Sequence, residues 1–114
     1  QRLSRLVGTG IAKELIYTAR NVKAEEAKSI GLVNKVVPAE SLLEEAKAMM
    51  QTILSKAPLA VRYAKIAINE GIQMDLYRGL ELEKDVCALT FGSDDSKEGM
   101  SAFLEKRPAV FQNK

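Results

Sequence analysis

The residues best suited to chemistry in this chain stand near its C-terminal end, at Phe103, Lys106 and Arg107. The two cations follow the aromatic ring by about one helical turn. Ammonium and guanidinium groups bind phosphate and an aromatic ring can stack on a flat base, so this spacing suits a phosphate-bearing ligand such as a nucleotide. The same spacing is typical of basic residues that stabilise the C-terminal end of a helix, where the carbonyl groups carry partial negative charge.

Three pairs of adjacent acids are candidates for a catalytic carboxylate pair: Glu25–Glu26, Glu44–Glu45 and Asp94–Asp95. Adjacent residues on a helix do not face each other. Each pair falls in the first turn of an expected helix, where negative charge interacts favourably with the helix dipole. We therefore interpret all three pairs as solvated carboxylates.

The single cysteine, Cys87, has no histidine anywhere in the chain to serve as its base. A reactive thiolate needs a neighbouring base or cation and some exposure, so the sequence predicts a small buried core residue at this position. Serine nucleophiles lack a base for the same reason, and a zinc site has too few ligands. The sequence thus predicts no catalytic residue, no metal site and no cofactor site within the chain.

The composition is that of an ordinary globular protein, with 46% hydrophobic and 28% charged residues among 114. A net charge of +2, from 17 basic and 15 acidic residues, is too small and too evenly mixed for a nucleic-acid surface. No apolar run approaches the roughly 20 residues that a membrane span needs. One cysteine excludes an intrachain disulfide and fits a reducing compartment. We therefore expect a cytoplasmic protein that binds neither nucleic acid nor membrane.

Helical periodicity dominates the chain. The expected helices cover about 1–7, 11–18, 24–30, 41–56, 58–69 and 76–91, and a last one runs from about 94 to Pro108. Pro58 suits the first turn of its helix and Asp75 is expected to be an N-cap. Capping-box spacing occurs twice, at Ser41 with Glu44 and at Asp95 with Glu98.

Three further expectations concern the apolar pattern and the chain ends. Residues 24–38 predict a short helix that stops at Gly31 and then a strand over 32–37. An isolated strand needs a partner that the chain does not supply, and Gln1 already lies inside a helical pattern, so we expect a fragment of a longer protein. In the last helix Met100, Phe103 and Leu104 form the apolar stripe, and the final six residues are expected to fray.

These segments resemble the crotonase (enoyl-CoA hydratase/isomerase) superfamily over essentially the whole chain. The likeness rests on QRLSRLVG from Gln1, AKELIYTA from Ala12, AEEAKSIGLVNKVVP from Ala24, APLAVRYAK from Ala57 and FGSDDSKEGMSAFLEKR from Phe91. The last segment is similar to a signature of short-chain enoyl-CoA hydratases and 3-hydroxybutyryl-CoA dehydratases. The chain departs from the family at Ala19-Arg20, where members often carry Gly-Asp, and at Cys87, where some members place an aromatic residue in the acyl pocket.

The resemblance implies a mainly α chain with one or two short β-strands, forming the C-terminal part of the α/β crotonase spiral fold. It implies that residues 1–38 end the crotonase core and that residues 39–114 form a helical oligomerisation region. In the family two glutamates activate water and two backbone amides form an oxyanion hole. These groups precede the part of the family that the chain matches, so the resemblance assigns no catalytic residue here.

The resemblance further implies reversible hydration of a short-chain 2-enoyl-CoA by the parent lyase, which forms trimers or stacked pairs of trimers. By matching positions, Phe103 and Lys106 are expected to contact the CoA bound to an adjoining subunit. The 114 residues alone are expected to be inactive and to self-associate, with helices exchanged between copies. Two alternatives remain open: a stand-alone helical interaction module, and the tail of another crotonase-family enzyme such as an enoyl-CoA isomerase.

Overall fold

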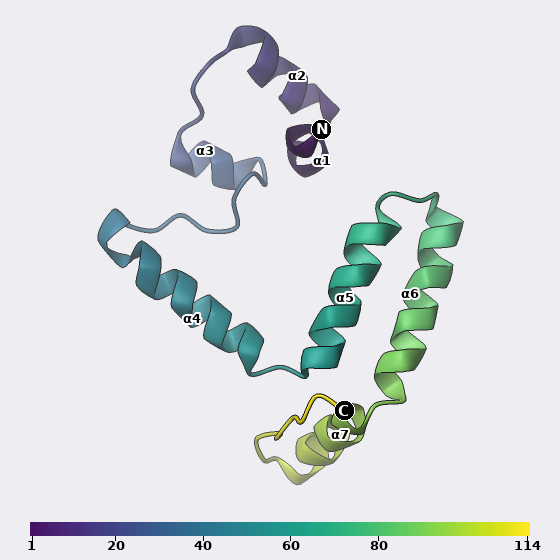
Figure 1. The fold of residues 1–114 in the computed structure, drawn as a ribbon. Coiled ribbons are helices and arrows are strands. Elements are labelled where there is room, and N and C mark those ends of the chain that lie inside the picture. The colour runs from purple at the N-terminus through teal and green to yellow at the C-terminus, as the bar shows by residue number, and fades with distance from the viewer. The chain divides into compact units, whose positions relative to one another are not determined.

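The computed structural model describes residues 1–114, and its regular elements are all helices (Figure 1). The expectation of a mainly helical chain is confirmed. The chain divides into two compact units, Gln1–Glu45 and Ala46–Lys114, each of which is described by itself. None of the helices combines the length and the apolar character that crossing a bilayer requires.

The first unit contains three short helices and a 3-10 turn: α1 (Arg2–Val7), α2 (Thr9–Thr18), α3 (Ala24–Ser29) and η1 (Ala39–Ser41). Gly8 separates α1 from α2 with a φ of 81°, a conformation that favours glycine. Its buried apolar residues are Val7, Ala12, Leu15 and Ala27. These come from all three helices, so the small core holds α1, α2 and α3 together.

The predicted stop after α3 is confirmed in detail. Gly31 has a φ of 76°, its amide donates to the Lys28 carbonyl, and the Leu32 amide donates to the Ala27 carbonyl at 2.8 Å. These two bonds form a Schellman motif, in which a left-handed residue lets the chain satisfy the last carbonyls of a helix. The glycine signal therefore predicted both the end of the helix and its geometry.

The strand predicted over 32–37 is wrong, because this segment forms no regular element. Its alternating apolar residues favour an extended chain, but a strand exists only when its backbone groups pair with a neighbour. No other extended segment of the chain forms a ladder with it. A side chain from this segment, Lys35, instead forms an ion pair with Glu45 at the start of the next helix.

The next helix, α4 (Leu42–Leu54), contains the boundary between the two units. The predicted capping box at its start is wrong, because the Ser41 hydroxyl donates to the Pro38 carbonyl at 3.1 Å instead of accepting an amide. The reason is that residues 39–41 already form a 3-10 turn leading into the helix. Ser41 therefore lies inside helical backbone instead of before it.

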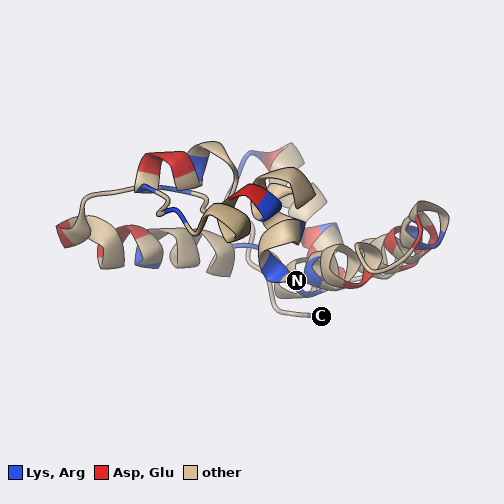
Figure 2. Ribbon diagram, turned by 90° about the horizontal axis from the view of Figure 1, so that it is seen from above, with Lys and Arg blue, Asp and Glu red and all other residues tan.

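The second unit also contains α5 (Pro58–Gly71), α6 (Leu76–Phe91) and α7 (Asp94–Glu105). Pro58 occupies the first turn of α5, and the Asp75 side chain accepts the Arg78 amide at 3.0 Å, so both predicted starts are confirmed. A short loop makes α5 and α6 an antiparallel pair (Figure 1). Acidic and basic residues are interspersed along the helices of both units (Figure 2).

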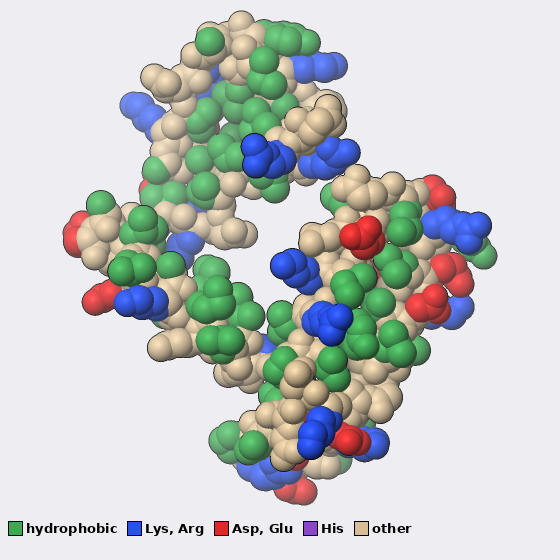
Figure 3. Space-filling model, in the orientation of Figure 1, with side chains coloured by type: hydrophobic (Ala, Val, Ile, Leu, Met, Phe, Trp, Pro, Cys, Tyr) green, Lys and Arg blue, Asp and Glu red, His purple; other side chains and the backbone are tan.

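The second unit buries few apolar residues, namely Val86 and Ala102. Large apolar side chains remain exposed along α5 and α6 (Figure 3), including Ile68, Ile72, Leu76 and Leu80. Amphipathic helices normally cover such faces by packing. The second unit thus presents apolar surface that its own residues leave uncovered.

Candidate functional site

The last helix, α7, buries Asp95 and Ala102 and leaves its apolar stripe exposed. Asp95 and Ala102 are each only 2% exposed, whereas Phe103 is 81% and Leu104 79% exposed. The sequence predicted the apolar stripe correctly but not its exposure. The two side chains that point outward lie next to the C-terminal end of the helix, where the candidate phosphate-binding cations stand.

The inward face of α7 is covered by the C-terminal segment 108–114. The Asp95 carboxylate accepts the amides of Gln112 at 2.6 Å and Asn113 at 2.9 Å, and the Asp95 amide donates to the Lys114 carbonyl at 3.0 Å. The ring of Phe111 lies against Gly99, where an added β-carbon would be 3.5 Å from the ring. The prediction that the final residues fray is therefore wrong.

Asp95 also does not cap the helix that contains it. That role belongs to Ser93, whose hydroxyl oxygen accepts the Ser96 amide at 3.1 Å. The predicted partner of Asp95, Glu98, instead accepts the Val110 amide at 2.8 Å. Both carboxylates thus bind the C-terminal segment, a long-range role that capping-box spacing does not reveal.

Arg107 is fully engaged within the chain. Its guanidinium donates to the Glu98 carboxylate at 2.6 and 2.9 Å and to Glu105 at 2.6 Å. These bonds lower the pKa of Glu98 to about 2, with the Arg107 hydrogen bonds as the largest cause and the Val110 amide next. Of the two cations that the spacing offered for phosphate, Arg107 is therefore already neutralised.

Lys106 is the remaining cation, and its backbone is unusual. It adopts a left-handed conformation with a φ of 55°. Its amide donates to the Phe103 carbonyl, and the Arg107 amide donates to the Ala102 carbonyl at 3.0 Å, which completes a second Schellman motif. Its exposed ammonium group forms no ion pair. Lys106 and Phe103 thus lie exposed at the same end of α7.

The members of each acidic pair have separate surroundings, as expected for residues that do not face each other. Glu26 binds Arg20, whose guanidinium hydrogen bond lowers the pKa of the Glu26 carboxyl, and Asp94 binds Lys97 at 2.8 Å. The interpretation as solvated carboxylates is wrong for Asp95, which is buried. No group of three or more acidic, cysteine or histidine side chains could hold a metal ion.

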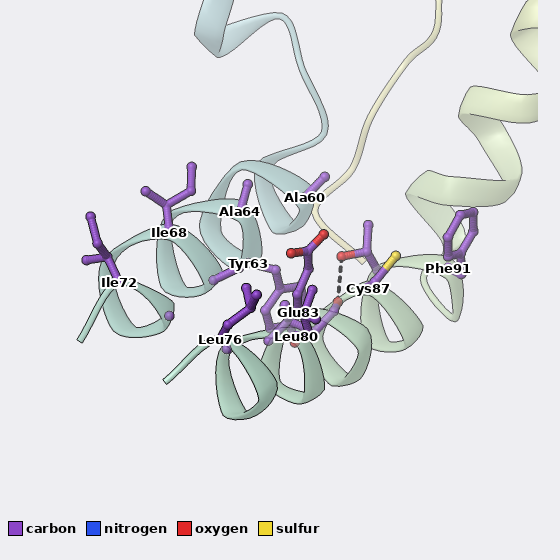
Figure 4. Close-up of a pocket in the computed structure, with 15 residues that line it drawn as sticks. Ala60, Tyr63, Ala64, Ile68, Ile72, Leu76, Leu80, Glu83, Cys87 and Phe91 are labelled. Carbon is purple, nitrogen blue, oxygen red and sulfur yellow. Dashed lines mark hydrogen bonds between the residues drawn. The ribbon is translucent and has the colours of Figure 1, made fainter. Parts of the chain in front are cut away.

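Cys87 lines an apolar groove of about 620 Å³ between α5 and α6 (Figure 4). Tyr63 on α5 and Leu80 and Glu83 on α6 contribute to the same groove. The predicted burial of Cys87 is wrong, because the thiol is exposed. The prediction rested on the lack of a base, which bears on the reactivity of the thiol, whereas its burial depends on whether another element covers this face of α6.

Comparison with known proteins identifies the family. The family model described as enoyl-CoA hydratase/isomerase matches residues 1–114. The chain belongs to this family. The resemblance read from the sequence motifs is therefore confirmed, and enoyl-CoA hydratases of known structure share the fold of the matched segment.

Several relatives are similar over most of the chain. A crotonyl-CoA hydratase of Syntrophomonas wolfei is 56% identical over 100% of the chain, which spans 44% of that protein. A short-chain-enoyl-CoA hydratase of Clostridium acetobutylicum is 51% identical over 94% of the chain and 41% of that protein. The crystal structure of an enoyl-CoA hydratase from Bacillus anthracis, 48% identical, matches with a TM-score of 0.95 over 100% of the chain and 44% of its own. The chain thus spans less than half the length of these family members.

Proposed function

We propose that this chain is the C-terminal part of a short-chain enoyl-CoA hydratase, and that it supplies one wall of the CoA-binding site. The parent enzyme would add water across the 2,3 double bond of an enoyl thioester and catalyse the reverse elimination. The names of the two hydratases described above support this substrate class. The glutamates and oxyanion-hole amides would lie in the part of the protein that precedes these residues.

In this proposal residues 1–38 end the crotonase core, and residues 39–114 form the helical oligomerisation region. The CoA contacts would come from Lys106 and Phe103. An ammonium group attracts phosphate oxygens, and an exposed aromatic ring offers a face on which an adenine or an acyl chain can lie. Both side chains leave the same end of α7, so one ligand can meet both.

The observation that carries this assignment is the contrast between two neighbouring cations. Arg107 is held by Glu98 and Glu105, whereas Lys106 has no acidic partner. A left-handed backbone is unfavourable for a residue with a β-carbon, by about 1–2 kcal/mol. Glycine is the usual residue at such a helix end. A lysine at this position is therefore readily explained if its ammonium group binds a ligand.

The test is steady-state kinetics of the full-length protein with crotonyl-CoA as substrate. Lys106→Gln is expected to raise KM several-fold, by about the 0.5–1.5 kcal/mol of a single net hydrogen bond, with little change in kcat. The control is Lys97→Gln, which removes the same charge from the first turn of the same helix. Equal KM values for Lys106→Gln and wild type would contradict the assignment.

The proposal also covers the assembly and location of the protein. The exposed apolar faces of α5 and α6 support a homo-oligomeric parent. The trimers or stacked pairs of trimers follow from the family resemblance, and we propose a cytoplasmic location. Residues 1–114 alone are expected to show no hydratase activity and to self-associate, with helices exchanged between copies. Size-exclusion chromatography of the isolated chain tests this, and a monomer that persists at high concentration would contradict it.

A further inference from the structure

The end of α7 is fixed by two successive sets of contacts. The first is the Schellman motif, which uses the backbone amides of Lys106 and Arg107. The second is the side chain of Arg107, which returns along the helix to Glu98, nine residues earlier, and forms two hydrogen bonds with its carboxylate. Because one residue takes part in both sets, the side-chain pair restrains the backbone turn in which Lys106 stands.

Glu98 also restrains the chain that follows the turn. Its carboxylate accepts the Val110 amide at 2.8 Å in addition to the Arg107 guanidinium. The same carboxylate therefore holds the chain that follows Lys106 at two points, at Arg107 before Pro108 and at Val110 after it. Residues in left-handed backbone persist only where the surroundings fix them, and Glu98 supplies such surroundings for Lys106.

We propose that Glu98 is a positioning residue for ligand binding, which acts through Arg107 to hold the turn that presents the ammonium group of Lys106 to the phosphates of CoA. This inference rests on the proposed function, because it assumes that Lys106 meets CoA. It adds that the affinity depends on a carboxylate that stands eight residues before Lys106 in the chain.

Charge alone predicts the opposite effect of removing Glu98. CoA is a polyanion, so replacing a nearby carboxylate by a neutral amide reduces repulsion and should strengthen binding. Positioning predicts weaker binding, because Lys106 loses its fixed orientation. Glu105 provides the matched control, since it also binds Arg107, at 2.6 Å, but does not hold the segment after Pro108.

The experiment measures the affinity of the full-length protein for coenzyme A by titration calorimetry and KM for crotonyl-CoA. Glu98→Gln is expected to weaken CoA binding by about threefold or more, which corresponds to one net hydrogen bond. KM should rise while kcat stays unchanged. Glu105→Gln should bind CoA as tightly as wild type or more tightly. Arg107→Lys, which keeps the charge but loses the forked geometry, should resemble Glu98→Gln.

The double variant Glu98→Gln/Lys106→Gln separates positioning from a general loss of structure. If Glu98 acts through Lys106, its removal has no further effect once Lys106 is absent. A loss that persists in the Lys106→Gln background overturns the proposal. The proposal is also overturned if Glu98→Gln binds CoA as tightly as wild type or more tightly while Lys106→Gln binds it more weakly. That outcome leaves the proposed function intact. No effect of Lys106→Gln overturns both.

Discussion

Gly79 of α6 lies directly against Gly71, the last residue of α5. A β-carbon added at Gly79 would be 3.3 Å from the Gly71 carbonyl oxygen, so the two helices meet backbone to backbone. Glycine inside a helix is unfavourable by about 1 kcal/mol relative to alanine. The close approach explains why a glycine stands in the first turn of α6, and both glycines line the groove between the two helices.

Gly79→Ala is expected to destabilise the protein. Alanine has the higher helix propensity, but its β-carbon would press on the Gly71 backbone, which can shift only if the end of α5 shifts with it. Overpacking of this kind destabilises a protein by about 1–3 kcal/mol. A urea denaturation curve should show a lower midpoint. The control is Gly99→Ala on α7, where the added carbon meets only the Phe111 ring at 3.5 Å, an ordinary contact. A Gly79→Ala protein as stable as Gly99→Ala would contradict the backbone contact.

Asp95 is expected to hold the C-terminal segment on α7. Its carboxylate is buried and accepts two backbone amides, so Asp95→Ala leaves both without partners and should destabilise the protein by about 1–3 kcal/mol. Hydrogen exchange should accelerate at the amides of Gln112 and Asn113. Asp94→Ala is the matched control, because its exposed carboxylate pairs with Lys97 and accepts neither of these amides. Unchanged exchange in Asp95→Ala would show that other contacts hold the segment.

Local signals predicted most of the fold. Helix ends were found where one residue type determines the backbone, as at Pro58, Asp75 and Gly31. The strand over 32–37 failed because its existence depends on a partner segment rather than on its own residues. The family resemblance identified the protein family, which helical periodicity alone did not reveal.

The candidate site was predicted less completely. Phe103 and Lys106 were selected from matching positions in the family, and the structure shows that both are exposed at the end of α7. The surroundings of Lys106 were missed, because Glu98, Arg107 and Val110 meet across 9 to 12 residues. Capping-box spacing assigned Glu98 to a nearby partner, Asp95, whereas its carboxylate binds Arg107 and Val110. No local sequence rule distinguishes these two roles. The apolar run of residues 108–111 after the helix was the available signal of an ordered segment.

The stabilising effect of Glu98 should disappear in acid. The pKa of its carboxyl is lowered from an ordinary 4.5 to about 2 by Arg107 and the Val110 amide. Its contribution to the free energy of unfolding is therefore fully present above about pH 4.5 and is lost as the pH falls towards 2, because the unfolded state binds the proton first.

The measurement compares urea midpoints of wild type and Glu98→Gln between pH 6 and pH 2. The difference should be largest at pH 6 and should vanish near pH 2. Glu26 and Asp94, whose pKa values are also lowered by cationic partners, titrate in both proteins and cancel in the difference. A difference that stays constant down to pH 2 would mean that the charge of Glu98 contributes nothing.

Lys106 and Ala19 share a left-handed backbone, with φ of 55° and 50°, at the ends of α7 and α2. Ala19→Gly should therefore stabilise the protein by about 1 kcal/mol, because glycine adopts this conformation without the steric conflict of a β-carbon. Lys106→Gly should give a similar gain in stability and, unlike Ala19→Gly, should raise KM for crotonyl-CoA in the full-length protein as Lys106→Gln does. Thermal unfolding and steady-state kinetics of the three variants measure the two effects separately. If Lys106→Gly kept the wild-type KM, the ammonium group would have no part in binding CoA, and the lysine at this helix end would need another explanation.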